Sequence, residues 1–144
     1  MTRFMARRMK SVLLIALGVL GCSLASCSTV TNRDIAEKAV ETFHTQFNSE
    51  LFETIELGAA PEFKGLAGSG KGYLAKAHDL MGKVHSSRQA VGTVQNMAGE
   101  AQISLTYLTE FANSSASETF VFRVKDKKAK LVFYEVGEKE LMNN

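Results

Sequence analysis

The interval between apolar residues changes once along this chain, and that change limits the folds open to it. From position 31 to about position 84, apolar residues recur every three or four positions, whereas from position 90 onward they recur every second position. The first interval is typical of amphipathic helices and the second of half-buried strands. Because the helical and strand segments do not alternate, the sequence predicts the α+β class.

The helical half predicts three helices. The first begins at Thr31 or Asn32, whose side chains can cap it, and continues for about four turns. A shorter second helix stops at Gly58, and residues 58–70 have the composition of a turn-rich loop. The third helix begins near position 70, and its apolar stripe extends to Val84.

The second half predicts four strands joined by short connections, which favour an antiparallel meander. They cover residues 91–95, 103–111, 119–125 and 131–136. We therefore expect N-terminal helices packed on a four-stranded antiparallel sheet, as one domain over residues 32–137, with residues 138–144 frayed.

The first 26 residues have the features of a lipoprotein signal peptide. Residues 1–10 are basic, and the apolar run that follows is far shorter than the ~20 residues of a membrane-spanning helix. The sequence Leu24-Ala25-Ser26-Cys27 comes next and resembles the bacterial lipobox, in which the cysteine is acylated and becomes the new N-terminus.

This resemblance implies palmitate-type acyl chains on Cys27 and a membrane-anchored protein of the bacterial cell envelope. Residues 27–31 would form a short tether, so the domain is expected close to the membrane surface. Ser28 is a non-aspartate residue after the cysteine, which favours the outer membrane, facing the periplasm, over the inner membrane.

Removing the leader changes the charge balance of the chain. The remaining 118 residues carry 13 basic and 15 acidic side chains. This balance argues against nucleic acid as a partner, because nucleic-acid binding requires a basic face. Cys22 and Cys27 are the only cysteines, so a lipidated chain would have no disulfide.

Two segments resemble small uncharacterised bacterial lipoproteins of the nuclear transport factor 2-like superfamily, also called cystatin-like or ketosteroid-isomerase-like. They are AEKAVETFHTQFNSELFETI, residues 36–55, and ETFVFRVKDKKAKLVFYEV, residues 118–136. The resemblance implies a curved sheet that wraps a long N-terminal helix to form a cone. Since the fold serves both enzymes and binding modules, it does not assign an activity.

The sequence offers no convincing general acid or base. Ketosteroid isomerase uses carboxyl groups and a tyrosine in its pocket, but Asp34, Asp79 and Asp126 are expected on helix surfaces or in a turn. His78 and His85, both expected on the third helix, would be ~10.5 Å apart along its axis, too far to share a metal ion. We therefore expect no metal, no cofactor and no catalysis, with an isomerase- or hydratase-like enzyme as the alternative.

Aromatic residues on the first helix and the strands suggest a binding pocket between the helix and the concave sheet face. Its expected lining is Phe43, Phe47, Tyr107, Phe120 and Phe122, although the same residues could simply fill the core. The expected ligand is a small apolar molecule, and a protein partner in the envelope is the other reading.

Two surfaces suggest further contacts. Four lysines cluster at the last predicted hairpin, where they either keep a charged turn soluble or meet anionic lipid headgroups. These are Lys125, Lys127, Lys128 and Lys130. The outer face of the sheet could also form a homodimer interface. Its apolar area would come from Leu108, Val121, Leu131 and Phe133.

Overall fold

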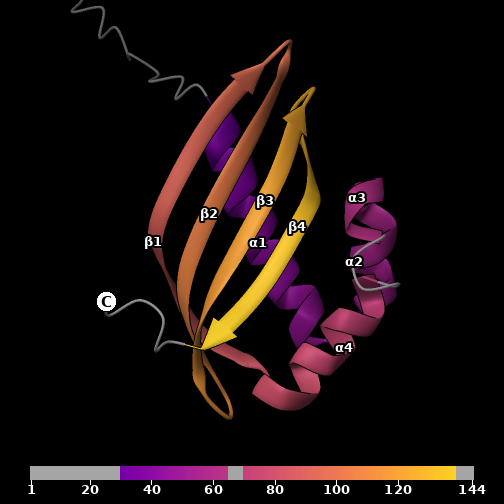
Figure 1. Cartoon of the computed structure of the whole chain (residues 1–144), viewed down its shortest axis with the longest axis vertical. Helices are drawn as coiled ribbons and strands as arrows, with labels where there is room; N and C mark the ends of the chain where they lie inside the picture. The colour runs from indigo at the N-terminus through magenta and orange to yellow at the C-terminus, as the bar shows by residue number, and fades with distance from the viewer. Residues whose placement is uncertain (1–29, 65–69, 139–144) are drawn as a thin grey trace, which may run out of the picture.

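The computed structural model describes residues 30–64 and 70–138, with helices first and strands after them (Figure 1). The helices are α1 (Asn32–Asn48), α2 (Phe52–Gly58), α3 (Pro61–Lys64) and α4 (Gly70–Met81). The strands are β1 (Val84–Met97), β2 (Glu100–Phe111), β3 (Ser115–Lys125) and β4 (Lys128–Glu138). They form one four-stranded antiparallel sheet in the order β1-β2-β3-β4, so the predicted α+β class and meander are confirmed.

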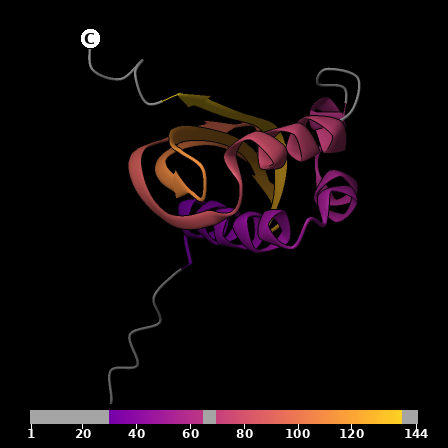
Figure 2. The same cartoon turned by 90° about the horizontal axis from the view of Figure 1, so that it is seen from below.

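Helix α1 lies across one face of the sheet (Figures 1 and 2). Its start is fixed by a capping box, in which the Thr31 hydroxyl accepts the Asp34 N–H at 3.1 Å and the Asp34 carboxylate accepts the Thr31 N–H at 2.7 Å. The apolar stripe buries Ala36, Val40, Phe43 and Phe47 against the sheet. The cap and the stripe are the features that the sequence predicted for this helix.

The segment between α2 and α4 differs from the predicted loop, because its beginning forms the short helix α3. Ala59 and Ala60 precede this helix and are buried, and the Ala60 N–H donates to the Leu131 carbonyl of β4 at 2.8 Å. Gly70 begins α4 against the ring of Phe63, where an added Cβ would come within 2.6 Å of a ring carbon. Close packing therefore ties α2 and α3 to β4 and explains a glycine at the start of α4.

The boundary between α4 and β1 lies earlier than predicted. Gly82 has a φ of +79°, and its N–H donates to the His78 carbonyl at 2.8 Å, so the helix ends there and Val84 begins the strand. His85 consequently lies on β1 and not on the third helix. Most side chains of this edge strand are exposed on both faces, which removes the period of two that would have revealed its first half.

The sheet contains a bulge that changes which side chains point inward. Buried and partly exposed residues alternate cleanly along β2 and β3, but the pairing of β3 with β4 shifts between Val121 and Phe122. Leu131 and Tyr134 are therefore both buried although they are three positions apart. The prediction that Leu131 belongs to the outer face is wrong for this reason.

Candidate functional site

A groove of about 670 Å³ lies between α1, α2 and the β3–β4 hairpin. Its apolar walls come from all of these elements and include Ile35, Ala39, Phe43, Ile55, Phe122 and Leu131. The volume is in the range of about 300–1,000 Å³ that is usual for small-molecule pockets. The groove is therefore large enough to accept a ligand.

One end of the groove lies where the chain enters the domain. Val30, which precedes α1, and Lys127, in the β3–β4 turn, both line it. We call this end, defined by Val30, the first turn of α1 and the turn Asp126-Lys127, the N-terminal pole; it is at the top of Figure 1. Asp126 and Lys127 have φ values of 49° and 58°, as a two-residue type I′ turn requires.

The five aromatic residues predicted to line a pocket divide into two groups. Phe43 and Phe122 form part of the groove wall. Phe47, Tyr107 and Phe120 are not among the groove residues and pack within the core. Phe120 is fully buried, with its ring centroid 5.0 Å from those of both Phe43 and Tyr134.

The lysine cluster lies around the turn at the N-terminal pole. Lys125, Lys127, Lys128 and Lys130 are all exposed. The Lys125 ammonium lies 3.2 Å from the Glu100 carboxylate, so part of its charge is balanced within the sheet. The structure thus brings the predicted lysines, the start of α1 and one end of the groove to the same pole.

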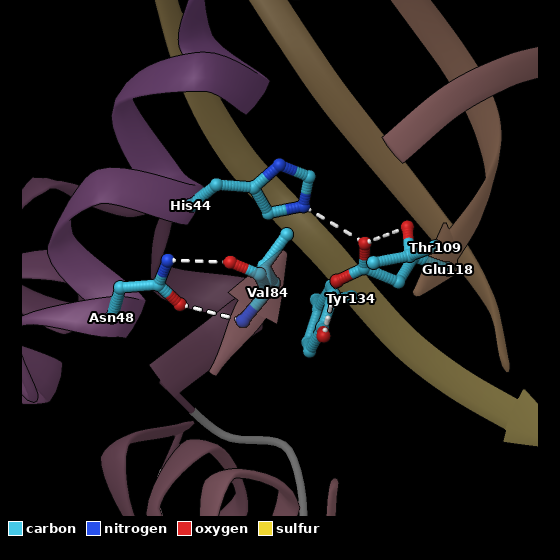
Figure 3. A network of polar contacts seen from close by, with 6 residues as sticks. All are labelled: His44, Asn48, Val84, Thr109, Glu118 and Tyr134. Atoms are coloured by element: carbon cyan, nitrogen blue, oxygen red, sulfur yellow. Dashed lines mark hydrogen bonds and ion pairs between the residues drawn. The ribbon is translucent and has the colours of Figure 1, made fainter. Parts of the chain in front are cut away.

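A buried carboxylate forms the most concentrated polar cluster in the described residues, and the sequence analysis missed it. Glu118 on β3 is 0% exposed. Its Oε2 lies 2.5 Å from the Thr109 hydroxyl and 2.8 Å from Nε2 of His44, and its Oε1 accepts the Tyr134 hydroxyl at 2.7 Å (Figure 3). A carboxylate needs such donors when it is removed from water.

The signal that identifies Glu118 is the period of two along β3. Glu118 precedes Phe120, Phe122 and Val124 at steps of two and so belongs to the same buried face. The predicted strand began at position 119, so it left out Glu118, the residue immediately before it. Thr109 on β2 shows the same period of two, because it follows Leu105 and Tyr107 at steps of two and lies on the same buried face.

The Glu118 cluster joins α1 to three strands but does not open into the groove. Its carboxylate is not among the groove residues, and His44, on α1, is 12% exposed. One turn further along α1, the Asn48 side chain donates to the Val84 carbonyl at 2.9 Å and accepts the Val84 N–H at 2.7 Å (Figure 3). Together these contacts connect α1 with β1, β2, β3 and β4, which is the geometry of a structural clamp.

No family model, curated protein or solved structure matches the chain.

In residues 30–64 and 70–138, no helix is long and apolar enough to cross a membrane. No group of three or more His, Cys, Asp or Glu side chains in them is arranged to hold a metal ion. The lipobox and Cys27 lie outside the described residues, as does the end of the chain after position 138.

Two buried tyrosines, Tyr107 and Tyr134, make the free energy of unfolding depend on pH in the alkaline range. Burial raises the pKa of Tyr107 to about 12, and nearby Glu37 and Glu41 act in the same direction. Burial, together with the charge and hydrogen bond of Glu118, raises the pKa of Tyr134 well above its ordinary value. The fold thus favours the neutral form of both side chains.

We expect this contribution to stability to be fully present below about pH 10, where unfolded tyrosine is also neutral. It is lost as pH rises toward 12, because the unfolded chain releases protons that the folded chain retains. Urea unfolding at a series of pH values from about 9 to 11 measures the loss. The variant Tyr107→Phe should lose less stability over this range, and identical pH slopes for it and the parent would refute the assignment to Tyr107.

Proposed function

We propose that this protein is a lipid-anchored module of the bacterial cell envelope, most consistent with the outer membrane facing the periplasm, that binds a small apolar ligand without catalysis. The groove at the N-terminal pole carries this proposal. Val30 lines the groove and follows Cys27 by three residues, a reach of at most ~10 Å. Acylation of Cys27 would therefore hold the Val30 end of the groove close to the membrane surface.

The arrangement of the elements supports the resemblance to nuclear transport factor 2-like proteins as part of the same proposal. An N-terminal helix lies along one face of a four-stranded antiparallel sheet, and further helices lie beside it (Figure 2). A cone of this superfamily would place a binding space at the open end of the sheet, between helix and strands. The groove occupies such a position beside α1.

Native mass spectrometry of the full chain, extracted from bacterial membranes in mild detergent, tests the proposal. The expected mass is that of residues 27–144 plus acyl groups, with additional bound mass from a ligand. An unmodified, soluble chain would overturn the anchor. An acylated chain that never carries or binds a small molecule, but copurifies with an envelope protein or a second copy, would replace the ligand by a protein partner.

The Glu118 cluster favours a second candidate, an isomerase- or hydratase-like enzyme of the same fold. A carboxylate beside a tyrosine and a histidine is a set of groups suited to proton transfer. However, Glu118 is fully buried and its donors are Thr109, Tyr134 and His44, so no substrate atom has a place beside it. This is why binding is preferred to catalysis.

The lysine cluster should strengthen attachment to anionic membranes. We expect serine at all four lysines to weaken binding of the unacylated full-length Cys27→Ser chain to phosphatidylglycerol-containing vesicles at least ~10-fold. The reason is that a lysine near an anionic surface contributes about 1 kcal/mol. The four positions are Lys125, Lys127, Lys128 and Lys130.

A matched variant removes the same number of charges from α4, from β1 and from the connection between them, away from the N-terminal pole. It changes Lys71, Lys76, Lys83 and Arg88 to serine. Vesicle cosedimentation at low salt compares the two variants with the parent. Equal binding by parent and lysine-cluster variant, or equal losses in both variants, would show that this cluster has no special contact with the membrane.

A further inference from the structure

The groove is elongated along α1. Its lining follows the helix from Asp34 to Gln46, which corresponds to ~18 Å at 1.5 Å per residue. The opposite wall is formed by α2 and by the last strand pair. A space of this form suits an extended chain better than a compact molecule.

The charged side chains of the groove are gathered at one end. Asp34 and Lys38, in the first two turns of α1, and Lys127, in the β3–β4 turn, are the charged residues that line it. Toward the other end the lining is apolar or uncharged, with Phe43, Ile55 and neighbouring residues. The groove is therefore amphipathic along its length.

The charged residues that line this end carry a net positive charge, because two lysines stand against one aspartate. The Asp34 carboxylate already accepts the N–H and the hydroxyl of Thr31, both at 2.7 Å, and these bonds lower its pKa. Lys38 and Lys127 form no ion pair with any residue that the structure describes. An anionic head group would thus meet two unpaired ammonium groups.

We propose that the groove binds a single-chain anionic amphiphile of the fatty-acid class. The carboxylate lies between Lys38 and Lys127, and the hydrocarbon chain extends along α1 past Phe43 toward Ile55. The inference rests on the proposed function, because it names the chemical class of the ligand in that groove. With the N-terminal pole held at a membrane, the charged end of the groove faces the surface from which such molecules can enter.

Photolabelling in membranes tests this. The full chain is reconstituted in phosphatidylcholine vesicles that contain trace amounts of a diazirine derivative of laurate, irradiated, digested and mapped by mass spectrometry. Peptides from α1, α2 and the β3–β4 hairpin should carry the label. A probe with the same hydrocarbon chain but an alcohol or a trimethylammonium head group should label these peptides at least ~5-fold less. This is expected when the two exposed lysine charges no longer attract the head group.

Two variants separate the head group from the chain. The double variant Lys38→Gln, Lys127→Asn removes both ammonium groups, and asparagine tolerates the positive φ at position 127. It should reduce laurate labelling about 5-fold and leave alcohol labelling unchanged. The matched control is Lys71→Gln, Lys83→Gln, which removes two exposed charges outside the groove and should label like the parent.

Thr54→Trp fills the groove from an exposed position on α2 and should reduce labelling by every probe at least ~10-fold. Gly58→Leu is a second filling variant, since an added Cβ there meets no atom within 4 Å. Equal labelling by all three head groups would overturn the fatty-acid class but leave an apolar ligand in place. Labelling outside the groove, or labelling that neither filling variant reduces, would overturn both, and loss of labelling as a dimer forms would assign the groove to a second copy.

Discussion

Replacement of Glu118 by alanine is expected to lower the free energy of unfolding by about 3–5 kcal/mol, because it leaves buried hydrogen-bonding groups without a partner and removes packed atoms. The carboxylate accepts hydrogen bonds from Thr109 and Tyr134 and contacts Nε2 of His44, all in the interior or at its margin. Its loss leaves these groups without their partner and creates a cavity at the same place. Urea unfolding of the full chain, followed by far-ultraviolet circular dichroism, gives the change.

Glu118→Gln preserves the shape of the side chain and keeps the measurement possible if the alanine variant does not fold. The amide retains one acceptor oxygen but presents N–H groups to donors, so we expect a loss of about 1–3 kcal/mol. Glu135→Ala serves as the control, because Glu135 is exposed on β4 and such a substitution changes stability by only about 0.5 kcal/mol.

The Glu118 variants also decide between clamp and catalyst. A structural clamp predicts that stability falls in both variants and that ligand binding in the groove persists in whichever variant folds. If both variants are as stable as the parent and the glutamine variant has lost an activity of the native protein, the cluster is catalytic and the clamp is excluded.

The sequence predicted those parts of the fold in which local pattern and environment agree. Helix α1 has a capping residue, an acidic residue three positions later and an unbroken apolar stripe, and its start was predicted to within a residue. Strands β2 and β3 have one buried and one partly exposed face, so their period of two is visible. In the central parts of these elements the structure agrees with the local signal, although β3 begins at Ser115, four residues before its predicted start.

The misses arise where tertiary contacts replace the local pattern. Strand β1 is exposed on both faces, so no apolar alternation marks its start at Val84. The bulge opposite Val121 turns Leu131 inward, a change that depends on the pairing of β3 with β4. Glu118 was hidden by its charge, because an ionisable residue on a buried face is rare unless distant partners satisfy it.

The sequence also could not show which of the predicted aromatic residues line the groove and which fill the core. Phe43 and Phe122 were expected in a pocket because they are aromatic and face the sheet interior, and the same reasoning applied to Phe47, Tyr107 and Phe120. Periodicity identifies the buried face but does not say which part of that face meets another element. That distinction came from α2 and the β3–β4 hairpin, which line the groove together with α1.

Phe120→Ala should lower the free energy of unfolding by about 3–5 kcal/mol, because truncation of a fully buried phenylalanine removes its contacts and leaves a cavity. The ring lies at the centre of an aromatic cluster, with Phe43 at 5.0 Å edge to face and Phe122 stacked at 6.1 Å. Such a loss is a large part of the ~5–15 kcal/mol that stabilises a typical domain. Thermal or urea unfolding of the full chain measures it.

Val121→Ala is the matched control, since Val121 is the next residue on β3 and is only partly buried on the other face, where a loss of no more than about 1 kcal/mol is expected. The comparison decides whether Phe120 belongs to the core or to a binding site. A core residue predicts the large difference between the two variants. If Phe120→Ala is as stable as Val121→Ala and instead changes labelling by the fatty-acid probe, the ligand site extends from the groove into the centre of the domain.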